Sequence, residues 1–431
     1  MPAADEVVDL CAELIRFDTS NFGGGDCRGE TPAAEWVVAR LAEVDVEAQL
    51  LESAPGRGNV VARINGTDPA APGLLVHGPL DVVPAVAEDW SVPPFSGVVR
   101  DGCLWGRGTY DMKSTCATTL ATVRAMLREG RRPRRDLVLA FTADEEDTGD
   151  YGAKFLAEQH AGLFAGVTEG ISESGAYTVH AGGRRFYPIA VGERGTAWMR
   201  LTATGEAGHG SRPGPDHAVL RLVNALSRLG TYDWPARPSE PVRELIEQAA
   251  AALGVPYDPE DLDGTADRLG GMGRFALQAL RCTATPTMLE AGYKVNVIPT
   301  AAQAHVDARV VPGAEIEFIE TLEKLLGEGI TYEFVNHENP LLAPHDSPLL
   351  EQMSESIQAF EPEARVVPFV MSGGTDAKAF ARLGIAGYGF TPLRLPEELP
   401  YHSLAHAVDE RVPVEGLEFG AQVFEQFIRD L

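Results

Sequence analysis

Apolar residues in the first part of the chain follow two alternating spacings. Intervals of three and four residues recur between Val7 and Ile15, which is typical of a helix that buries one face. Strand-like runs come later, and the two that are continuous and apolar, Leu74–His77 and Leu137–Thr142, indicate strands buried on both faces of a sheet. The predicted strands are Val60–Ile64, Leu74–His77 and Leu137–Thr142, and further helices are predicted at Thr31–Val44, Ser114–Glu129 and Gly152–His160. Strands that alternate with helices predict an α/β fold with parallel character.

The middle of the chain has a different pattern. It reads strand, helix, strand, strand, helix, strand, and it is interrupted by an insert with proline, glycine and acidic residues. The elements are predicted at Ala197–Thr204, His217–Leu229, Thr285–Glu290, Ala302–Val311, Glu315–Leu326 and Thr331–Val335. This order predicts helices packed on an antiparallel sheet, and the α/β pattern resumes near Leu349. We therefore expect a discontinuous α/β domain, residues 1–193 and 339–431, with an α+β domain inserted at residues 194–338.

Composition narrows the class of protein. Apolar residues make up 44% and charged residues 23%, which is ordinary for a globular protein. The formal net charge of −27 repels nucleic acid and anionic membranes, so neither is an expected partner. No apolar stretch approaches the roughly 20 residues of a bilayer-spanning helix, and the acidic start does not resemble a signal peptide, so we expect a cytoplasmic protein. The five cysteines are scattered, which argues against a disulfide framework and against a thiolate zinc site.

Acidic side chains follow the predicted strands. A glycine-rich loop ends at Asp111, four consecutive acids from Asp144 to Asp147 follow a buried strand, and Glu173 follows another short apolar run. Sites in open α/β sheets form just beyond the carboxyl ends of strands. Carboxylates crowded in this way repel one another unless cations neutralise them, and together with His406 they are ligands that suit zinc. The alternative is an exposed acidic loop with no bound metal.

Six strings in order along the chain resemble the M20 metallopeptidases, which include aminoacylases, carboxypeptidases and succinyl-diaminopimelate desuccinylases. The strings are GRGTYDMK from Gly106, TADEE from Thr142, GHGS from Gly208, NVIP from Asn296, GGTD from Gly373 and HAVDER from His406. The resemblance implies a phosphorylase/hydrolase-like mixed-sheet catalytic domain. It also implies that the inserted α+β domain is a ferredoxin-like lid, through which two copies of the chain form a homodimer.

The resemblance also implies roles for individual residues. Asp111 would bridge two zinc ions, with Glu146 and His406 holding one of them and Glu173 helping to hold the other. Glu145 would be the general base, which takes a proton from water and delivers it to the leaving amine.

The remaining implied roles concern the substrate. His209 of the lid would stabilise the oxyanion, Asn296 and Arg309 would hold the substrate, and Gly374 would present its backbone N–H nearby. Without the resemblance, His209 and Asn296 read as loop residues, and Arg309 as a partner of Asp307. No motif contains His180, His305, His337, His345 or His402, and these histidines are expected to be structural.

One position departs from the family pattern. The family has a metal-ligating histidine two residues before the aspartate that matches Asp81, and this chain has Pro79 there. Proline has no side-chain donor atom, and Asp81 loses the imidazole that it would orient. The zinc that uses Glu173 therefore keeps two expected ligands, whereas the other zinc keeps three.

Three interpretations of Pro79 follow. The enzyme uses one tight zinc site beside a weak or vacant one, or His77 replaces the lost ligand, or the scaffold has left hydrolysis. Replacement by His77 requires a rearranged strand end, because two residues along a strand span about 6–7 Å. The leading hypothesis is zinc-dependent hydrolysis of an amide bond in a small N-acyl amino acid or peptide with a free carboxylate. The alternative is a non-hydrolytic or regulatory homologue with an impaired di-metal site, which binds or converts an amino-acid-like substrate.

Overall fold

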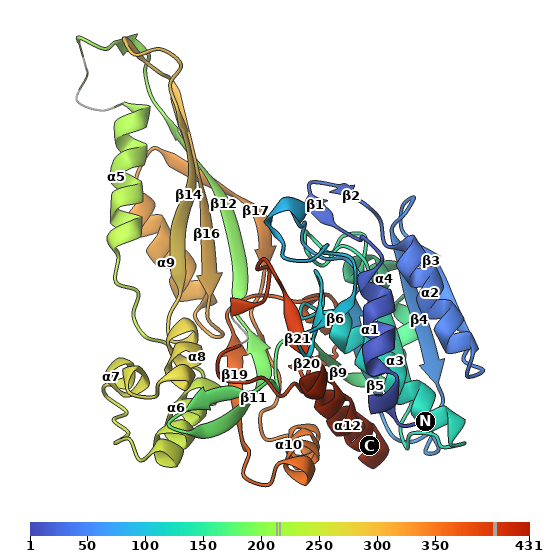
Figure 1. Cartoon of the computed structure of the whole chain (residues 1–431). Coiled ribbons are helices and arrows are strands. Elements are labelled where there is room, and N and C mark those ends of the chain that lie inside the picture. Colours follow the sequence, from blue (N-terminus) through green and yellow to red (C-terminus); the bar gives the residue numbers. More distant parts are fainter. Residues whose placement is uncertain (213, 215–216, 400–402) are drawn as a thin grey trace.

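A large mixed sheet forms one end of the molecule. The structure of the molecule is a computed structural model, which describes residues 1–212, 214, 217–399 and 403–431 (Figure 1). The strand order is β10-β11-β20-β9-β5-β8-β4-β3, and β18 and β19 also pair with β11. The strands are β3 (Ala48–Glu52), β4 (Gly58–Ile64), β5 (Gly73–Pro79), β8 (Leu137–Thr142), β9 (Val167–Ser172), β10 (Val179–Ala181), β11 (Arg184–Glu193), β18 (Leu341–Leu342), β19 (Arg365–Met371) and β20 (Ala386–Gly389).

Helices cover both faces of this sheet. Its larger apolar core lies between the sheet and α1, α2, α3, α10 and α12, and a smaller core lies on the other face under α4 and α11. The helices are α1 (Val7–Ile15), α2 (Thr31–Ala42), α3 (Lys113–Arg128), α4 (Ala153–Gln159), α10 (Pro348–Phe360), α11 (Ala377–Ala381) and α12 (Val414–Asp430). Every residue of β5 and β8 is buried, which confirms the prediction from their continuous apolar runs.

The inserted segment forms a second, antiparallel sheet that extends away from the first (Figure 1). Its strand order is β14-β16-β12-β17, and α5 and α9 pack on one of its faces. The elements are β12 (Gly195–Thr204), α5 (Ala218–Thr231), β14 (Thr283–Ala291), β16 (Ala301–Val310), α9 (Glu315–Leu326) and β17 (Ile330–Glu338). The predicted strand–helix order of this region is therefore confirmed. We call these elements the lid.

The insert with the weak sequence pattern folds into three helices that the sequence analysis did not predict. These are α6 (Glu240–Leu253), α7 (Leu262–Asp267) and α8 (Gly271–Ala279). Their apolar side chains pack with Phe186 of β11 and with Val367 and Phe369 of β19, so they cover the large sheet rather than the lid sheet. The division of the chain at residues 193 and 339 remains our proposal, and these helices are the part of the inserted segment that contacts the larger domain.

Short strands outside these two sheets form three small sheets. They are β1 (Asn21–Gly23), β2 (Asp26–Cys27), β6 (Val98–Arg100), β7 (Cys103–Trp105), β13 (Gly208–His209), β15 (Val297–Ile298) and β21 (Arg411–Pro413). Within the described residues, no helix is both long and apolar enough to cross a membrane.

Candidate metal centre and substrate cleft

Three neighbouring parallel strands deliver the acidic residues to one edge of the large sheet. β5 pairs in parallel with β8 on one side and with β9 on the other, so their carboxyl ends meet. Asp81 follows β5, Glu145 and Glu146 follow β8, and Glu173 follows β9. The predicted gathering of these side chains therefore results from the strand order.

Three of the predicted ligands form a group that could hold a metal ion. Ligand atoms of Asp111, Glu146 and His406 all lie within 4.8 Å of one another. The Nε2 atom of His406 is 3.2 Å from Oδ2 of Asp111 and 3.3 Å from Oε2 of Glu146. We call these three residues the acid–imidazole group. Two carboxylates and one imidazole match the donor set of a three-ligand zinc site, so the residues present fit a divalent ion.

The charge state of this region also fits a cation. Burial raises the pKa of Glu146 to about 7, and burial with the nearby charges of Glu173 and Glu146 raises the pKa of Glu145 well above its usual value. Hydrogen bonds to Asp111 and Glu146 raise the pKa of His406 to about 10. Burial and the crowding of carboxylates raise the pKa of the two glutamates, and a divalent ion bound beside them would favour their charged forms.

The other half of the expected paired site is depleted. We call Asp111, Glu173 and the position of Pro79 the second half-site. Glu173 is buried beside Asp111, and its Oε1 atom has no hydrogen-bond donor in the described part of the chain. Pro79 ends β5 opposite Thr142, and its carbonyl accepts a hydrogen bond from the thiol of Cys116. No third ligand joins Asp111 and Glu173 among the described residues.

His77 lies in an apolar environment. Its ring packs against Phe380, with the two ring centroids 4.8 Å apart, and burial lowers its pKa to about 3. It is not part of the acid–imidazole group. The structure therefore gives no support to the interpretation in which His77 replaces the lost ligand.

Asp81 contacts the backbone of the acidic loop. Its two carboxylate oxygens accept hydrogen bonds from the backbone N–H groups of Glu145 and Glu146, each at 3.1 Å. The side-chain amide of Asn21 donates to Asp81 at 2.9 Å and to Asp144 at 3.2 Å. Asp81 thus holds the two glutamates that the sequence analysis considered catalytic and metal-ligating. Asn21 was missed, because nothing in its local sequence connects it to residues so distant.

The four consecutive acids divide into two kinds. Asp144 is buried, and its carboxylate pairs with Arg57 at 2.6 Å and accepts the backbone N–H of Tyr151 at 3.2 Å. Asp147 accepts the backbone N–H of Gly24 at 2.9 Å. These two acids hold the loop in place. Glu146 joins the acid–imidazole group, and Glu145 and Asp147 line the cleft described next.

A cleft of about 120 Å³ lies where the lid meets the large sheet, and it contains Glu145. Arg309 and Gly374 line the same cleft, so the structure brings these three predicted residues together. The guanidinium of Arg309 forms two hydrogen bonds to Asp307, at 2.7 and 3.0 Å, as the simpler interpretation of its sequence suggested. Arg309 is therefore held in place at the wall of the cleft.

Lys378 is a cleft residue that the sequence analysis missed. It is buried, and its ammonium lies 3.5 Å from Oγ1 of Thr196 and 3.8 Å from Oε2 of Glu338. A Cβ atom added at Gly374 would lie 2.6 Å from this ammonium, so the absence of a side chain at Gly374 makes room for the lysine. The position two residues after Asp376, in the string that begins at Gly373, was the available signal.

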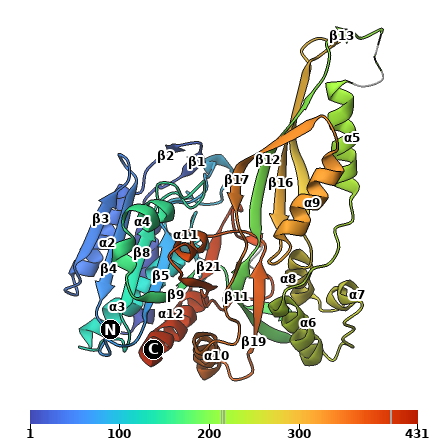
Figure 2. The ribbon, with the colours of Figure 1, turned by 180° about the vertical axis from the view of Figure 1, so that it is seen from behind.

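The other two predicted lid residues lie away from the cleft in this chain. His209 belongs to β13, which pairs with β15 at the outer end of the lid (Figure 2). The His209 side chain is exposed, and the backbone N–H of Ser211 donates to its Nδ1 at 3.2 Å. Asn296 is also exposed, and its backbone carbonyl accepts a hydrogen bond from the backbone N–H of Gly210. His402 lies outside the described residues.

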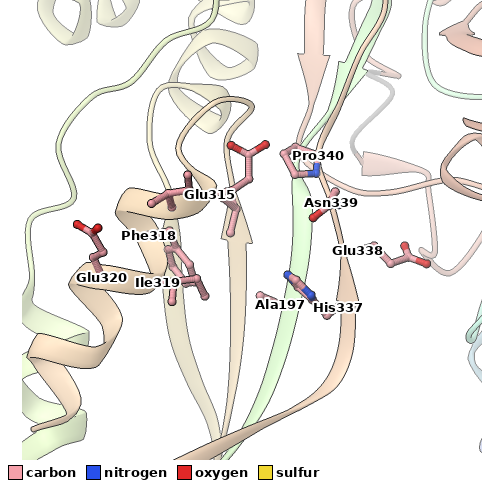
Figure 3. Close-up of a pocket in the computed structure, with 11 residues that line it drawn as sticks. Ala197, Glu315, Phe318, Ile319, Glu320, His337, Glu338, Asn339 and Pro340 are labelled. Atoms are coloured by element: carbon pink, nitrogen blue, oxygen red, sulfur yellow. The ribbon is translucent and has the colours of Figure 1, made fainter. Parts of the chain in front are cut away.

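A larger cavity, of about 340 Å³, lies on the helix-covered face of the lid (Figure 3). Its walls are mostly apolar and come from α9, β12 and the end of β17. Neighbouring residues of a strand face opposite sides, so Ala197 and Val310 line this cavity whereas Thr196 and Arg309 line the cleft. None of the predicted site residues borders the larger cavity, so we place the chemistry in the cleft.

A mixed α/β sheet with a second sheet inserted, and an acid–imidazole group near the carboxyl end of β8, are the features expected of a metallopeptidase. The chain belongs to peptidase family M20/M25/M40, whose model matches residues 75–430. It is 28% identical over 391 residues to the N-fatty-acyl-amino acid synthase/hydrolase PM20D1 of Homo sapiens, covering 85% of this chain and 76% of that protein. It is also 28% identical over 414 residues to aminoacylase-1 of Sus scrofa, covering 93% of this chain and 89% of that protein.

A solved structure supports the fold. The M20 family metallo-carboxypeptidase Sso-CP2 from Sulfolobus solfataricus has a TM-score of 0.73, and the match covers 99% of both chains at 22% sequence identity. The family match confirms the resemblance found in the sequence, and the solved structure confirms the predicted fold class. The protein is an enzyme of the peptidase and amidohydrolase class.

Proposed function

We propose that the protein hydrolyses an amide bond in a small N-acyl amino acid or peptide with a free carboxylate, with zinc as its metal. The observation that supports this proposal is the cleft, which Glu145 lines together with three cationic residues, Lys154, Arg309 and Lys378. The names of the human and porcine relatives, a hydrolase of N-fatty-acyl amino acids and an aminoacylase, support the same substrate class.

The chain's own residues supply the acid–base chemistry. A divalent ion held by Asp111, Glu146 and His406 would polarise the scissile carbonyl and lower the pKa of water in the site. Glu145 takes the proton from the attacking water and delivers it to the leaving amine, and burial with the nearby charges of Glu173 and Glu146 raises the pKa of its carboxyl, which makes it a stronger base. Asp81 fixes the backbone of Glu145 and so aims its carboxylate.

The substrate carboxylate is held at the other end of the cleft. Arg309 and Lys378 are the cations that we assign to it, because the third, Lys154, pairs with Glu338 at 3.2 Å. An anionic substrate group would replace Glu338, which is 3.8 Å away, as a partner of Lys378. A side chain at position 374 would have to displace the Lys378 ammonium from its present place.

We further propose that the enzyme acts as a homodimer through the lid. His209 belongs to β13 at the outer end of the lid, Asn296 directly precedes its partner strand β15, and neither lines the cleft that contains Glu145. A second copy would bring its own lid tip to this cleft. Mixing the inactive variants Glu145→Gln and His209→Asn tests this idea, because subunit exchange would rebuild complete sites and return activity. Two variants that stay inactive after exchange would contradict it.

The competing function is a non-hydrolytic or regulatory role, and Pro79 is the observation that favours it. A screen of N-acyl amino acids and dipeptides with zinc-loaded enzyme separates the two. Hydrolysis that disappears in Glu145→Gln supports the amidohydrolase. Wild-type protein that binds these compounds without turnover, and retains the same affinity in Glu145→Gln, supports the alternative.

A further inference from the structure

Two residues of the sequence motifs have no role in the function proposed so far. They are Arg107, in the loop that leads to Asp111, and Glu410, shortly after His406. Both are buried, with exposed fractions of 3% and 0%. Their side chains meet, with Nη1 of Arg107 2.6 Å from Oε2 of Glu410, although they are 303 positions apart in the sequence. Burying a charged side chain costs free energy unless the charge is paired and hydrogen-bonded. The burial of both charges at this place therefore needs an explanation.

The Glu410 carboxylate organises the loop before the metal ligand. It accepts hydrogen bonds from the backbone N–H groups of Gly108 at 3.1 Å, Tyr110 at 2.7 Å and Asp111 at 3.1 Å. With Arg107 it therefore has four donors. One of these donors is the backbone N–H of Asp111 itself, so Glu410 directly fixes the position of the main chain that carries this ligand.

The Arg107 guanidinium organises the opposite segment. It donates to the backbone carbonyls of His406 at 3.3 Å and Ala407 at 3.1 Å, and its carbon lies 5.2 Å from the centre of the Trp90 ring. His406 has a φ of 59°, a left-handed conformation that is unfavourable for most residues other than glycine. The hydrogen bond from Arg107 to the His406 carbonyl stabilises that conformation, which turns the imidazole toward Asp111 and Glu146.

We propose that Arg107 and Glu410 are positioning residues that set the separation of Asp111 and His406 and thereby determine the metal affinity of the acid–imidazole group. Each side chain contacts the backbone of one ligand, and the ion pair joins them. A metal site tolerates errors of only about 0.5 Å in the positions of its ligands. This inference rests on the metal site of the proposed function. It goes beyond that function because it assigns affinity to two residues that touch neither metal nor substrate.

The alternative is that the pair only stabilises the fold. The chain offers a matched control, the buried pair of Glu6 and Arg124, whose side chains are 8% and 5% exposed and lie 3.3 Å apart. That pair joins the start of the chain to α3 and contacts none of the three ligands of the acid–imidazole group. A role in folding alone predicts the same consequences for both pairs.

The experiment measures Zn²⁺ affinity by competition with a chromophoric chelator, in wild type, Glu410→Gln and Glu6→Gln, at a temperature where all three are folded. We expect Zn²⁺ to bind at least about tenfold more weakly to Glu410→Gln, the range found when outer partners of metal ligands are removed. Glu6→Gln should bind Zn²⁺ within about twofold of wild type even though its urea midpoint falls. Equal affinity in Glu410→Gln and wild type would overturn the inference.

A second pair of variants keeps the test informative if Glu410→Gln does not fold. Arg107→Met removes the contacts to the His406 segment and should weaken Zn²⁺ binding similarly, while Arg107→Lys should recover part of it. Arg107→Met with wild-type affinity would overturn the inference. Wild-type protein that binds no Zn²⁺ would overturn both this inference and the proposed function, whereas tight wild-type binding with unaffected variants overturns this inference alone.

Discussion

The acid–imidazole group and the second half-site share Asp111 and differ in the residue that completes them. In the first, His406 adds an imidazole within 3.3 Å of both carboxylates. In the second, Glu173 stands beside Asp111, and Pro79 occupies the position where the family pattern has a histidine. The carboxylates remain in both, so the comparison isolates what a single imidazole contributes. It predicts one tight metal ion per chain.

The largest effect on turnover should come from replacing the proposed general base, Glu145, because proton transfer requires it whichever half-site holds the metal. Glu145→Gln keeps the size of the side chain but cannot accept a proton, so turnover should fall by about 10²–10⁴-fold. Initial rates measure the loss, and circular dichroism with thermal unfolding checks that the variant folds. A variant that keeps near-full activity would remove Glu145 from the mechanism.

Removing one ligand from each half-site tests their inequality. His406→Ala leaves two carboxylates in the acid–imidazole group, so bound zinc should fall from one per chain to none after gentle desalting. Glu173→Gln should leave one zinc in place. Metal analysis of the desalted proteins decides the matter, and equal losses in both variants would show that the half-sites are not distinct.

Restoring the missing imidazole should make the half-sites alike. Pro79→His adds a third donor beside Asp111 and Glu173, and zinc should rise from one toward two per chain. Pro79→Ala is the matched control, because it removes the proline ring without adding a donor. If the histidine variant and the alanine variant hold the same amount of zinc, the loss of the second site has another cause.

A smaller effect is expected at the carboxylate end of the cleft. Lys378→Met should raise KM about tenfold or more for an N-acyl amino acid, the size of a lost hydrogen bond to a charged group, and leave KM for its carboxamide nearly unchanged. Glu338→Gln should lower KM for the acid, because it removes the competing anion. Effects of the same sign in the two variants would argue for a structural role only.

The smallest effect concerns the pH dependence of stability. His77 has a folded-state pKa of about 3, below the value near 6.5 expected for the unfolded chain, so the unfolded state binds more protons between these values. Its contribution to the free energy of unfolding is therefore present above pH 6.5 and declines by up to about 1.4 kcal/mol for each pH unit below it. His77→Phe should lose this component of the slope, which urea unfolding at pH 7.0 and 5.5 measures. An unchanged slope would mean that His77 is not buried as a neutral ring.

Much of the fold was predictable because the signals are local. Continuous apolar runs gave β5 and β8, and the spacing of apolar residues gave α9 at its observed bounds, Glu315–Leu326. The spacing of Val242, Leu245, Ile246 and Ala249 carries the same signal for α6, but the prolines and acids around it hid the helix. The surface that α6 covers could not be predicted, since it belongs to β19, more than a hundred residues later.

For the site, the sequence by itself determined that acidic residues follow the predicted strands, namely Asp81, Glu145, Glu146 and Glu173. It also determined that position 79, a proline, has no donor atom for a metal. It could do so because a strand's end fixes the placement of the next few residues. Only the tertiary structure decided that Asn21 bridges Asp81 and Asp144, that Lys378 faces the cleft, and that Arg107 meets Glu410. Those contacts join segments far apart in the chain, and they depend on burial and on the order of strands in the sheet, which no local pattern specifies.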